Sequence, residues 1–171
     1  KEALKILIEV LENTNQEPMV RHEAAEALGA IGSPESLKIL EKYRNDPVIE
    51  VAETCELALE RIKWLENPEK SLDSSENPYK SIDPAPPAPT KDLSELKSIL
   101  LCEDQSLFNR YRAMFALRNL RTKEAVETLG EGLKAGSALF RHEIAFVLGQ
   151  IQDEVSVKYL TESLENREEN E

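Results

Sequence analysis

Hydrophobic residues recur at helical spacing through most of this chain. In residues 2–12, Leu4, Leu7, Ile8 and Leu11 form one apolar stripe with gaps of three or four positions. Similar patterns predict further helices over 18–32, from 34, from 47 to 64, from 92, and over about 107–120, 123–133, 139–151 and 155–164. Long stretches of Ala, Leu, Glu, Lys and Ile also favour helix, so we expect an all-α fold.

Several of these helices are preceded by start signals. The dipeptides Glu17-Pro18 and Asp46-Pro47 place Pro in a first helical turn, where its missing N–H costs nothing. Ser33 is an N-cap residue, and Asp92 with Glu95 has the spacing of a capping box. These signals fix the starts of the predicted helices more closely than the apolar stripes do.

The chain is also repetitive. Arg21-His22-Glu23 recurs as Arg141-His142-Glu143, and Ala27-Leu28 recurs as Ala58-Leu59, 31 residues later. The segment Arg110-Tyr111-Arg112 precedes Arg141-His142-Glu143 by the same 31 residues. A period near 30 that contains two helices indicates a helical-repeat solenoid.

A Pro-rich segment interrupts the repeats. Residues 67–90 hold most of the prolines, with Ser, Asp and Asn, and show no helical period. We expect extended, polyproline-like backbone at 83–89. The sequence therefore predicts two partial repeat halves, 1–66 and 91–171, joined by a linker at 67–90.

The composition of the chain limits the classes of function that it can have. The net charge of −12 argues against binding to nucleic acid and suits a basic partner, although acidic charge can also serve solubility alone. No apolar run approaches the ~20 residues that cross a bilayer. Cys55 and Cys102 have no paired spacing and are expected to be reduced thiols in a cytoplasmic protein.

The two histidines occupy equivalent places in two copies of one unit, and a carboxylate follows each. Adjacent helical residues diverge by about 100°, so one His-Glu pair chelates poorly and ligands must converge from several repeats. Imidazole with carboxylate and no thiolate suits iron, manganese or zinc, and two His with one carboxylate indicate non-haem Fe(II). The opposing interpretation is two surface histidines that coincide on related repeats.

Several longer segments resemble the deoxyhypusine hydroxylase family. They are 16–23, 46–55, the linker residues 81–87, 110–119 and 136–143. The resemblance spans nearly the whole chain, and it implies a HEAT-like solenoid of two helical-repeat halves that hold a di-iron centre. It also implies an enzyme that uses molecular oxygen to hydroxylate deoxyhypusine on a eukaryotic translation elongation factor, which completes hypusine.

The resemblance assigns roles to four residues. His22 and Glu23 would bind one Fe2+ and His142 the other, whereas Glu143 would face the substrate amine. The family pattern has four His-Glu pairs, and this chain carries two. We therefore expect the chain alone to be inactive, and we expect further pairs about one repeat before His22 and after His142 in a longer protein.

Two other functions remain open at this point. One is a non-catalytic HEAT-repeat scaffold whose concave face binds a protein. The other is a helical-repeat lyase or a chaperone-like module without metal. Metal analysis separates these alternatives from the iron-dependent monooxygenase.

Overall fold

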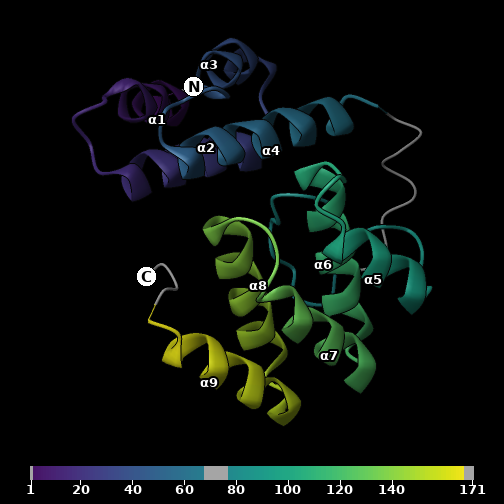
Figure 1. Ribbon diagram of the computed structural model, residues 1–171. Coiled ribbons are helices and arrows are strands. Elements are labelled where there is room, and N and C mark those ends of the chain that lie inside the picture. The colour runs from purple at the N-terminus through teal and green to yellow at the C-terminus, as the bar shows by residue number, and fades with distance from the viewer. Residues whose placement is uncertain (1, 68–76, 168–171) are drawn as a thin grey trace. The chain divides into compact units, whose positions relative to one another are not determined.

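The computed structural model describes residues 2–67 and 77–167, and within these ranges the regular structure is helical (Figure 1). The described chain divides into two compact units. The first contains four α-helices and one 3-10 helix: α1 (Glu2–Glu12), α2 (Pro18–Ile31), η1 (Pro34–Ser36), α3 (Leu37–Tyr43) and α4 (Ile49–Leu65). The all-α prediction is confirmed.

The second unit continues the same pattern. Its elements are α5 (Leu93–Leu101), α6 (Leu107–Leu120), α7 (Lys123–Gly132), α8 (Ala138–Ile151), η3 (Glu154–Ser156) and α9 (Val157–Glu165). The helix α8 and the 3-10 turn η3 repeat the lengths of α2 and η1 at equivalent positions. The described helices therefore follow the repeat that the sequence predicts.

Local capping explains where α5, α6, α7 and α8 begin. The side chains of Ser106, Thr122 and Ser137 each accept a hydrogen bond from the backbone N–H three residues later, at 3.2–3.3 Å. Asp92 likewise accepts from the Glu95 N–H at 3.0 Å, as the capping-box spacing predicts. These bonds satisfy N–H groups that have no partner within the helix.

One predicted helix start is displaced. The helix expected from Pro47 begins at Ile49, because Asp46 Oδ1 accepts from the Val48 N–H at 2.9 Å and forms a turn. The same carboxylate pairs with Arg21, at 2.6 Å from Nη2. Asp46 is thus held by a residue of another helix, which the local sequence pattern does not show.

The core of the first unit lies between α2 and α4, which run alongside each other (Figure 1). A Cβ atom added at Gly29 would lie 2.7 Å from the Cβ atom of Ala58, so the glycine permits the close approach of these helices. The buried core cluster of this unit also draws on α1 and α3, and apart from Cys55 it is aliphatic: Leu4, Leu11, Ala24, Ala25, Leu28, Leu40, Val51, Cys55, Ala58, Leu59 and Ile62. This contact fixes which residues of α4 face α2.

The core of the second unit is more aromatic. Tyr111 packs against Phe115 and Phe140, with ring centroids 6.1 and 5.7 Å apart. The Arg110 guanidinium lies 4.0 Å from the Phe140 ring centroid, and its Nε donates to the Leu100 carbonyl at 2.9 Å. The Arg110 guanidinium therefore stacks on the aromatic core near the start of α6.

The Pro-rich segment is only partly within the described residues, because 68–76 lie outside them. Residues 81–91 form no helix or strand, but Ala85 and Ala88 are buried. In the first unit, Arg61 Nε donates to the Asp83 carbonyl at 3.0 Å. In the second, the Ala88 N–H donates to the carbonyl of Arg112 at 2.9 Å. These bonds anchor the described part of the Pro-rich segment. The polyproline-like backbone expected at 83–89 and the domain limits at 66 and 91 stay predictions.

None of the helices in the described ranges combines the length and the apolar character that crossing a membrane requires.

Candidate functional site

His22, on α2, is buried, and a residue of another helix contacts its ring. His22 is 6% exposed, and its Nδ1 lies 2.6 Å from Oγ1 of Thr54, which is also buried. Thr54 belongs to α4, one repeat later in the chain. A neighbouring repeat therefore orients this imidazole.

Two carboxylates lie beside the other ring nitrogen. Nε2 of His22 is 3.9 Å from Glu23 Oε1 and 3.7 Å from Glu26 Oε2. Burial raises the pKa of the Glu26 carboxyl, and the negative charge of Glu23 raises it further. Bringing a cation to this group of side chains would relieve the repulsion between the two carboxylates.

The packing of α2 against α4 holds this arrangement in place. Gly29, two helical turns after His22, allows Ala58 and with it the whole of α4 to approach closely. At the other end, Arg21 Nε donates to the Leu11 carbonyl at 3.0 Å, and Nη1 and Nη2 bond the Asp46 carboxylate at 3.2 and 2.6 Å. Contacts at Gly29 and at Arg21 therefore hold α2 in place on either side of the His22 imidazole.

The matching tripeptide on α8 has different surroundings. His142 is exposed and Glu143 is half-buried. Gly149, the counterpart of Gly29, has no described atom within 4 Å of an added Cβ, and Phe146 is 55% exposed. Within the described part of the second unit, no helix covers this face of α8 in the way that α4 covers α2 in the first unit.

The fit of these residues to a metal is partial. Among the described residues, no three His, Cys, Asp or Glu side chains are arranged to hold a metal ion. The structure does bring His22 and Glu23 together on α2, and their nitrogen and oxygen donors suit a ferrous ion. His142 and Glu143 lie in the second unit. The predicted ligands His22, Glu23 and His142, and the predicted substrate contact Glu143, stay predictions.

Sequence reasoning missed two residues beside His22. Glu26 follows His22 by four positions, a spacing that places two side chains on one helical face and could have identified it. Thr54 lies 32 residues after His22, close to the repeat period, so the period could have pointed to it. Its hydrogen bond depends on packing between helices and has no local signal.

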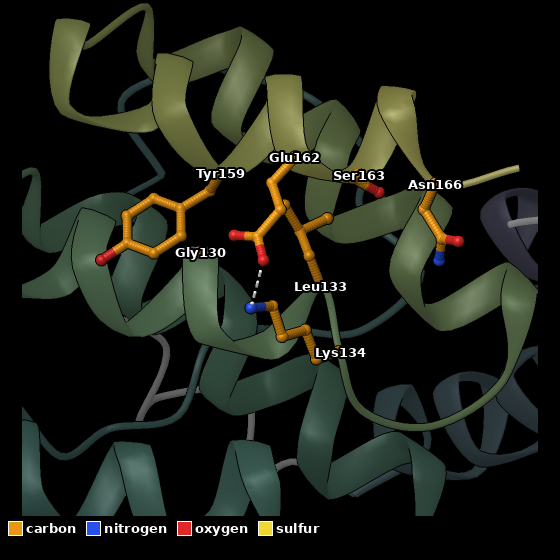
Figure 2. Close-up of a pocket in the computed structure, with 7 residues that line it drawn as sticks. All are labelled: Gly130, Leu133, Lys134, Tyr159, Glu162, Ser163 and Asn166. Atoms are coloured by element: carbon orange, nitrogen blue, oxygen red, sulfur yellow. Dashed lines mark hydrogen bonds and ion pairs between the residues drawn. The ribbon is translucent and has the colours of Figure 1, made fainter.

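Within residues 2–67 and 77–167, the remaining chemical groups form no second group of metal ligands. Cys55 and Cys102 are free thiols, and burial, with a further contribution from Asp46, raises the pKa of the Cys55 thiol to about 12. A pocket between α7 and α9 is lined by the Tyr159 ring against Gly130 and by the Lys134–Glu162 ion pair at 2.7 Å (Figure 2). None of the residues predicted for the metal site lines this pocket.

Comparison with known proteins gives one consistent result. The chain is 62% identical over 171 residues to a deoxyhypusine hydroxylase of Drosophila melanogaster, covering 99% of this chain and 56% of that protein. It is 55% identical over 168 residues to the human deoxyhypusine hydroxylase, covering 98% of this chain and 55% of that protein. The chain thus spans about half the length of the curated relatives it matches.

A solved structure agrees with these relatives. The human deoxyhypusine hydroxylase in complex with glycerol matches with a TM-score of 0.92 at 55% identity, over 99% of this chain and 58% of that one. The resemblance that the sequence motifs indicated is therefore confirmed. A model of HEAT repeats also matches residues 1–60 and 93–171, and the chain belongs to the HEAT-repeat family.

Proposed function

We propose that this chain forms part of a deoxyhypusine hydroxylase, an iron-dependent monooxygenase that acts on a deoxyhypusine-containing translation factor in the cytoplasm. The observation that carries the proposal is the 55–62% identity, along nearly the whole chain, to proteins with that activity in their names. The environment of His22 supports the proposal. The His22 side chain is buried and a hydrogen bond orients its ring, and a surface histidine without a function would need neither feature.

Each predicted residue has a role in this proposal. His22 and Glu23 hold one Fe2+, His142 contributes to the other, and Glu143 binds the amine of the substrate. When bound, the irons supply the activation of molecular oxygen that hydroxylation of an aliphatic carbon requires. The net charge of −12 favours a substrate side chain that carries positive amines.

The chain alone is expected to bind iron weakly and to lack hydroxylase activity. The described residues offer His22 and Glu23 in one unit and His142 in the other, and no complete set of three ligands. Folding does not depend on the metal, because the helices bury their apolar faces against neighbouring helices. Stoichiometric iron that survives dialysis, measured by elemental analysis, would contradict this expectation.

A chimera tests the function. Residues 1–171 would replace the matching segment of the Drosophila melanogaster relative, which is 62% identical. We expect the chimera to bind iron and to hydroxylate a deoxyhypusine-containing protein, detected by the mass of one added oxygen. The His22→Ala variant of the chimera serves as the matched control and should lose iron and activity.

The alternative of a non-catalytic scaffold makes the opposite prediction. A chimera that folds and binds its protein substrate, yet shows neither iron nor product, would favour that alternative. A chimera whose His22→Ala variant keeps full iron content would remove His22 from the ligand set while leaving the activity itself supported.

A further inference from the structure

The hydroxyl group of Thr54 lies between two groups that restrict its hydrogen bonding. Its Oγ1 is 2.6 Å from Nδ1 of His22 and 2.7 Å from the backbone carbonyl oxygen of Glu50, one turn earlier on α4. Thr54 and His22 are 3% and 6% exposed, so bulk water has little access to either bond. A buried threonine inside a helix commonly bonds the carbonyl four residues earlier in this way.

The direction of these bonds assigns the imidazole proton. A threonine hydroxyl has one proton to donate, and a carbonyl oxygen can only accept. With that proton directed to Glu50, Oγ1 accepts from an N–H at Nδ1 of His22. In the neutral imidazole the lone pair then lies on Nε2, because one ring nitrogen donates while the other accepts.

Nε2 is also the nitrogen that faces the carboxylates. It lies 3.9 Å from Glu23 and 3.7 Å from Glu26, both longer than a hydrogen bond. A metal-binding histidine usually donates its second N–H to an oxygen, which fixes the tautomer and the ring orientation. The Thr54 hydroxyl supplies such an oxygen from the neighbouring repeat.

We propose that Thr54 is a positioning residue that keeps the proton of His22 on Nδ1 and thereby presents the Nε2 lone pair to a divalent metal. The metal part of this inference rests on the proposed function, whereas the assignment of the tautomer does not. His142 offers an internal comparison, since its ring is exposed on α8.

The tautomer can be measured without any metal. The chain has two histidines, so a long-range 1H–15N correlation spectrum of the 15N-histidine-labelled protein contains two imidazole patterns, and His142→Gln assigns them. The spectrum would be recorded about two pH units above the ordinary imidazole pKa of about 6.5. We expect His22 to carry its proton on Nδ1, and wild-type protein with the proton on Nε2 would overturn the proposal.

Matched variants separate the hydroxyl group from the shape of the side chain. Thr54→Val keeps the volume and removes the hydroxyl, and it should move the His22 population toward the Nε2–H tautomer. Thr54→Ser keeps the hydroxyl and should leave the wild-type pattern. If Thr54→Val retains the wild-type tautomer in a protein whose circular dichroism is unchanged, Thr54 does not control the proton.

A titration with Zn2+, a diamagnetic probe for a divalent metal, tests the second step through the 15N shift of Nε2. Loss of the hydrogen bond that a metal-binding histidine donates to an oxygen typically weakens metal affinity by about 10- to 100-fold. We expect that loss in Thr54→Val and little change in Thr54→Ser. An altered tautomer with unchanged Zn2+ affinity would overturn the positioning role. Because the chain alone is expected to bind metal weakly, the titration extends to a large excess of Zn2+. A wild-type His22 whose Nε2 shift does not respond even then would count against the proposed metal ligand, while the metal-free spectrum would still decide the tautomer.

Discussion

The helices α2 and α8 carry the same Arg-His-Glu tripeptide, yet the two helices give it different surroundings. On α2, His22 is buried and bonded to Thr54, and Gly29 lies against Ala58. On α8, His142 is exposed, and no described atom lies near the Cβ position of Gly149. The tripeptide thus specifies a place in the repeat, and the helix packed against it decides what its side chains do.

The largest expected difference between the two helices concerns the arginine of the tripeptide. Arg21 forms a buried ion pair with Asp46, whereas Arg141 donates to the Gly136 carbonyl at 2.6 Å. Arg21→Met leaves a buried carboxylate without its cation and should lower the free energy of unfolding by about 3–5 kcal/mol. Arg141→Met should cost about 0.5–1.5 kcal/mol, the usual contribution of a hydrogen bond.

Urea unfolding measures both arginine variants. Trp64, the single tryptophan, lies on α4 and reports the first unit, while circular dichroism reports the helices of both. Equal losses of unfolding free energy in the two variants would mean that the ion pair with Asp46 does not make Arg21 more important for stability than Arg141.

The Asp46 ion pair should also make the first unit sensitive to acid. Burial opposes ionisation of Asp46, but the hydrogen bonds from Arg21 and the Val48 N–H, with the charge of Arg21, outweigh it and lower the pKa of the carboxyl. Its stabilising contribution is therefore complete above the unfolded-state pKa of about 3.9 and is lost as pH falls through the lower folded-state pKa.

Asp46→Asn tests this dependence, because the amide cannot titrate. The gap in unfolding free energy between wild type and Asp46→Asn, followed by Trp64 fluorescence in urea, should be wide at neutral pH and should narrow in acid. A gap that stays constant down to pH about 2, well below the ordinary carboxyl pKa, would show that Asp46 is not stabilised as an anion.

The glutamates of the tripeptides should differ in iron and in substrate binding. In the chimera, Glu23→Ala removes a proposed ligand and should lose iron. Glu143→Ala should keep iron but lose a charge-assisted contact with the substrate amine, worth roughly 1.5–3 kcal/mol or about 10- to 150-fold in affinity. The test measures iron content and substrate affinity for both variants. Equal iron loss in the two variants would mean that both carboxylates are iron ligands.

The glycines at the helix contact should respond to alanine with opposite signs. At Gly29 a new Cβ would meet the Ala58 Cβ at 2.7 Å and its Cα at 3.0 Å, so Gly29→Ala should cost about 1–3 kcal/mol through overpacking. At Gly149 nothing described lies within 4 Å, so Gly149→Ala should stabilise by about 0.5–1 kcal/mol through helix propensity. Destabilisation by Gly149→Ala in urea would show that something covers that face of α8.

The sequence predicted the helices well because their ends depend on local groups. The helix α6 runs from Leu107 to Leu120 as expected, and the structure adds that the Ser106 side chain, directly before it, caps its first turn. The start of α4 was predicted two residues early, because Asp46 Oδ1 accepts from the Val48 N–H and forms a turn before the helix; the same carboxylate also pairs with Arg21. Local patterns therefore find the helices, but the α-helical starts shift by two or three residues where a turn or a 3-10 helix comes first, as at α3, α4 and α9.

In the candidate site too, some features could be predicted from the sequence and others depend on how the helices pack. The repeat pattern identified His22 and His142 as equivalent positions, but it could not show that one ring is buried and the other exposed. That difference arises from Thr54 and Ala58 on α4, whose contacts with α2 are formed only on folding. Helical spacing alone would have found Glu26, four residues after His22.

The smallest expected contrast lies at the C-terminal ends of α2 and α8, where Gly32 and Gln152 occupy equivalent places. Both have left-handed backbone, with φ of 68° and 56°, and each donates its N–H to a leucine carbonyl four residues earlier. Glycine adopts this conformation without the strain that a side chain causes. Gln152→Gly should therefore stabilise the second unit by about 0.5–1 kcal/mol, and Gly32→Gln should destabilise the first by about 1–2 kcal/mol.

The two exchanges should not be mirror images. A Cβ atom at Gly32 would also lie 2.8 Å from Leu65 Cδ1, the far end of a side chain that is 43% exposed and can move aside. Gly32→Gln therefore carries a small packing cost in addition to the backbone strain, so its loss should exceed the gain from Gln152→Gly. Urea unfolding of both variants gives the two values, and a Gln152→Gly protein no more stable than wild type would mean that contacts of the Gln152 side chain compensate for its backbone strain.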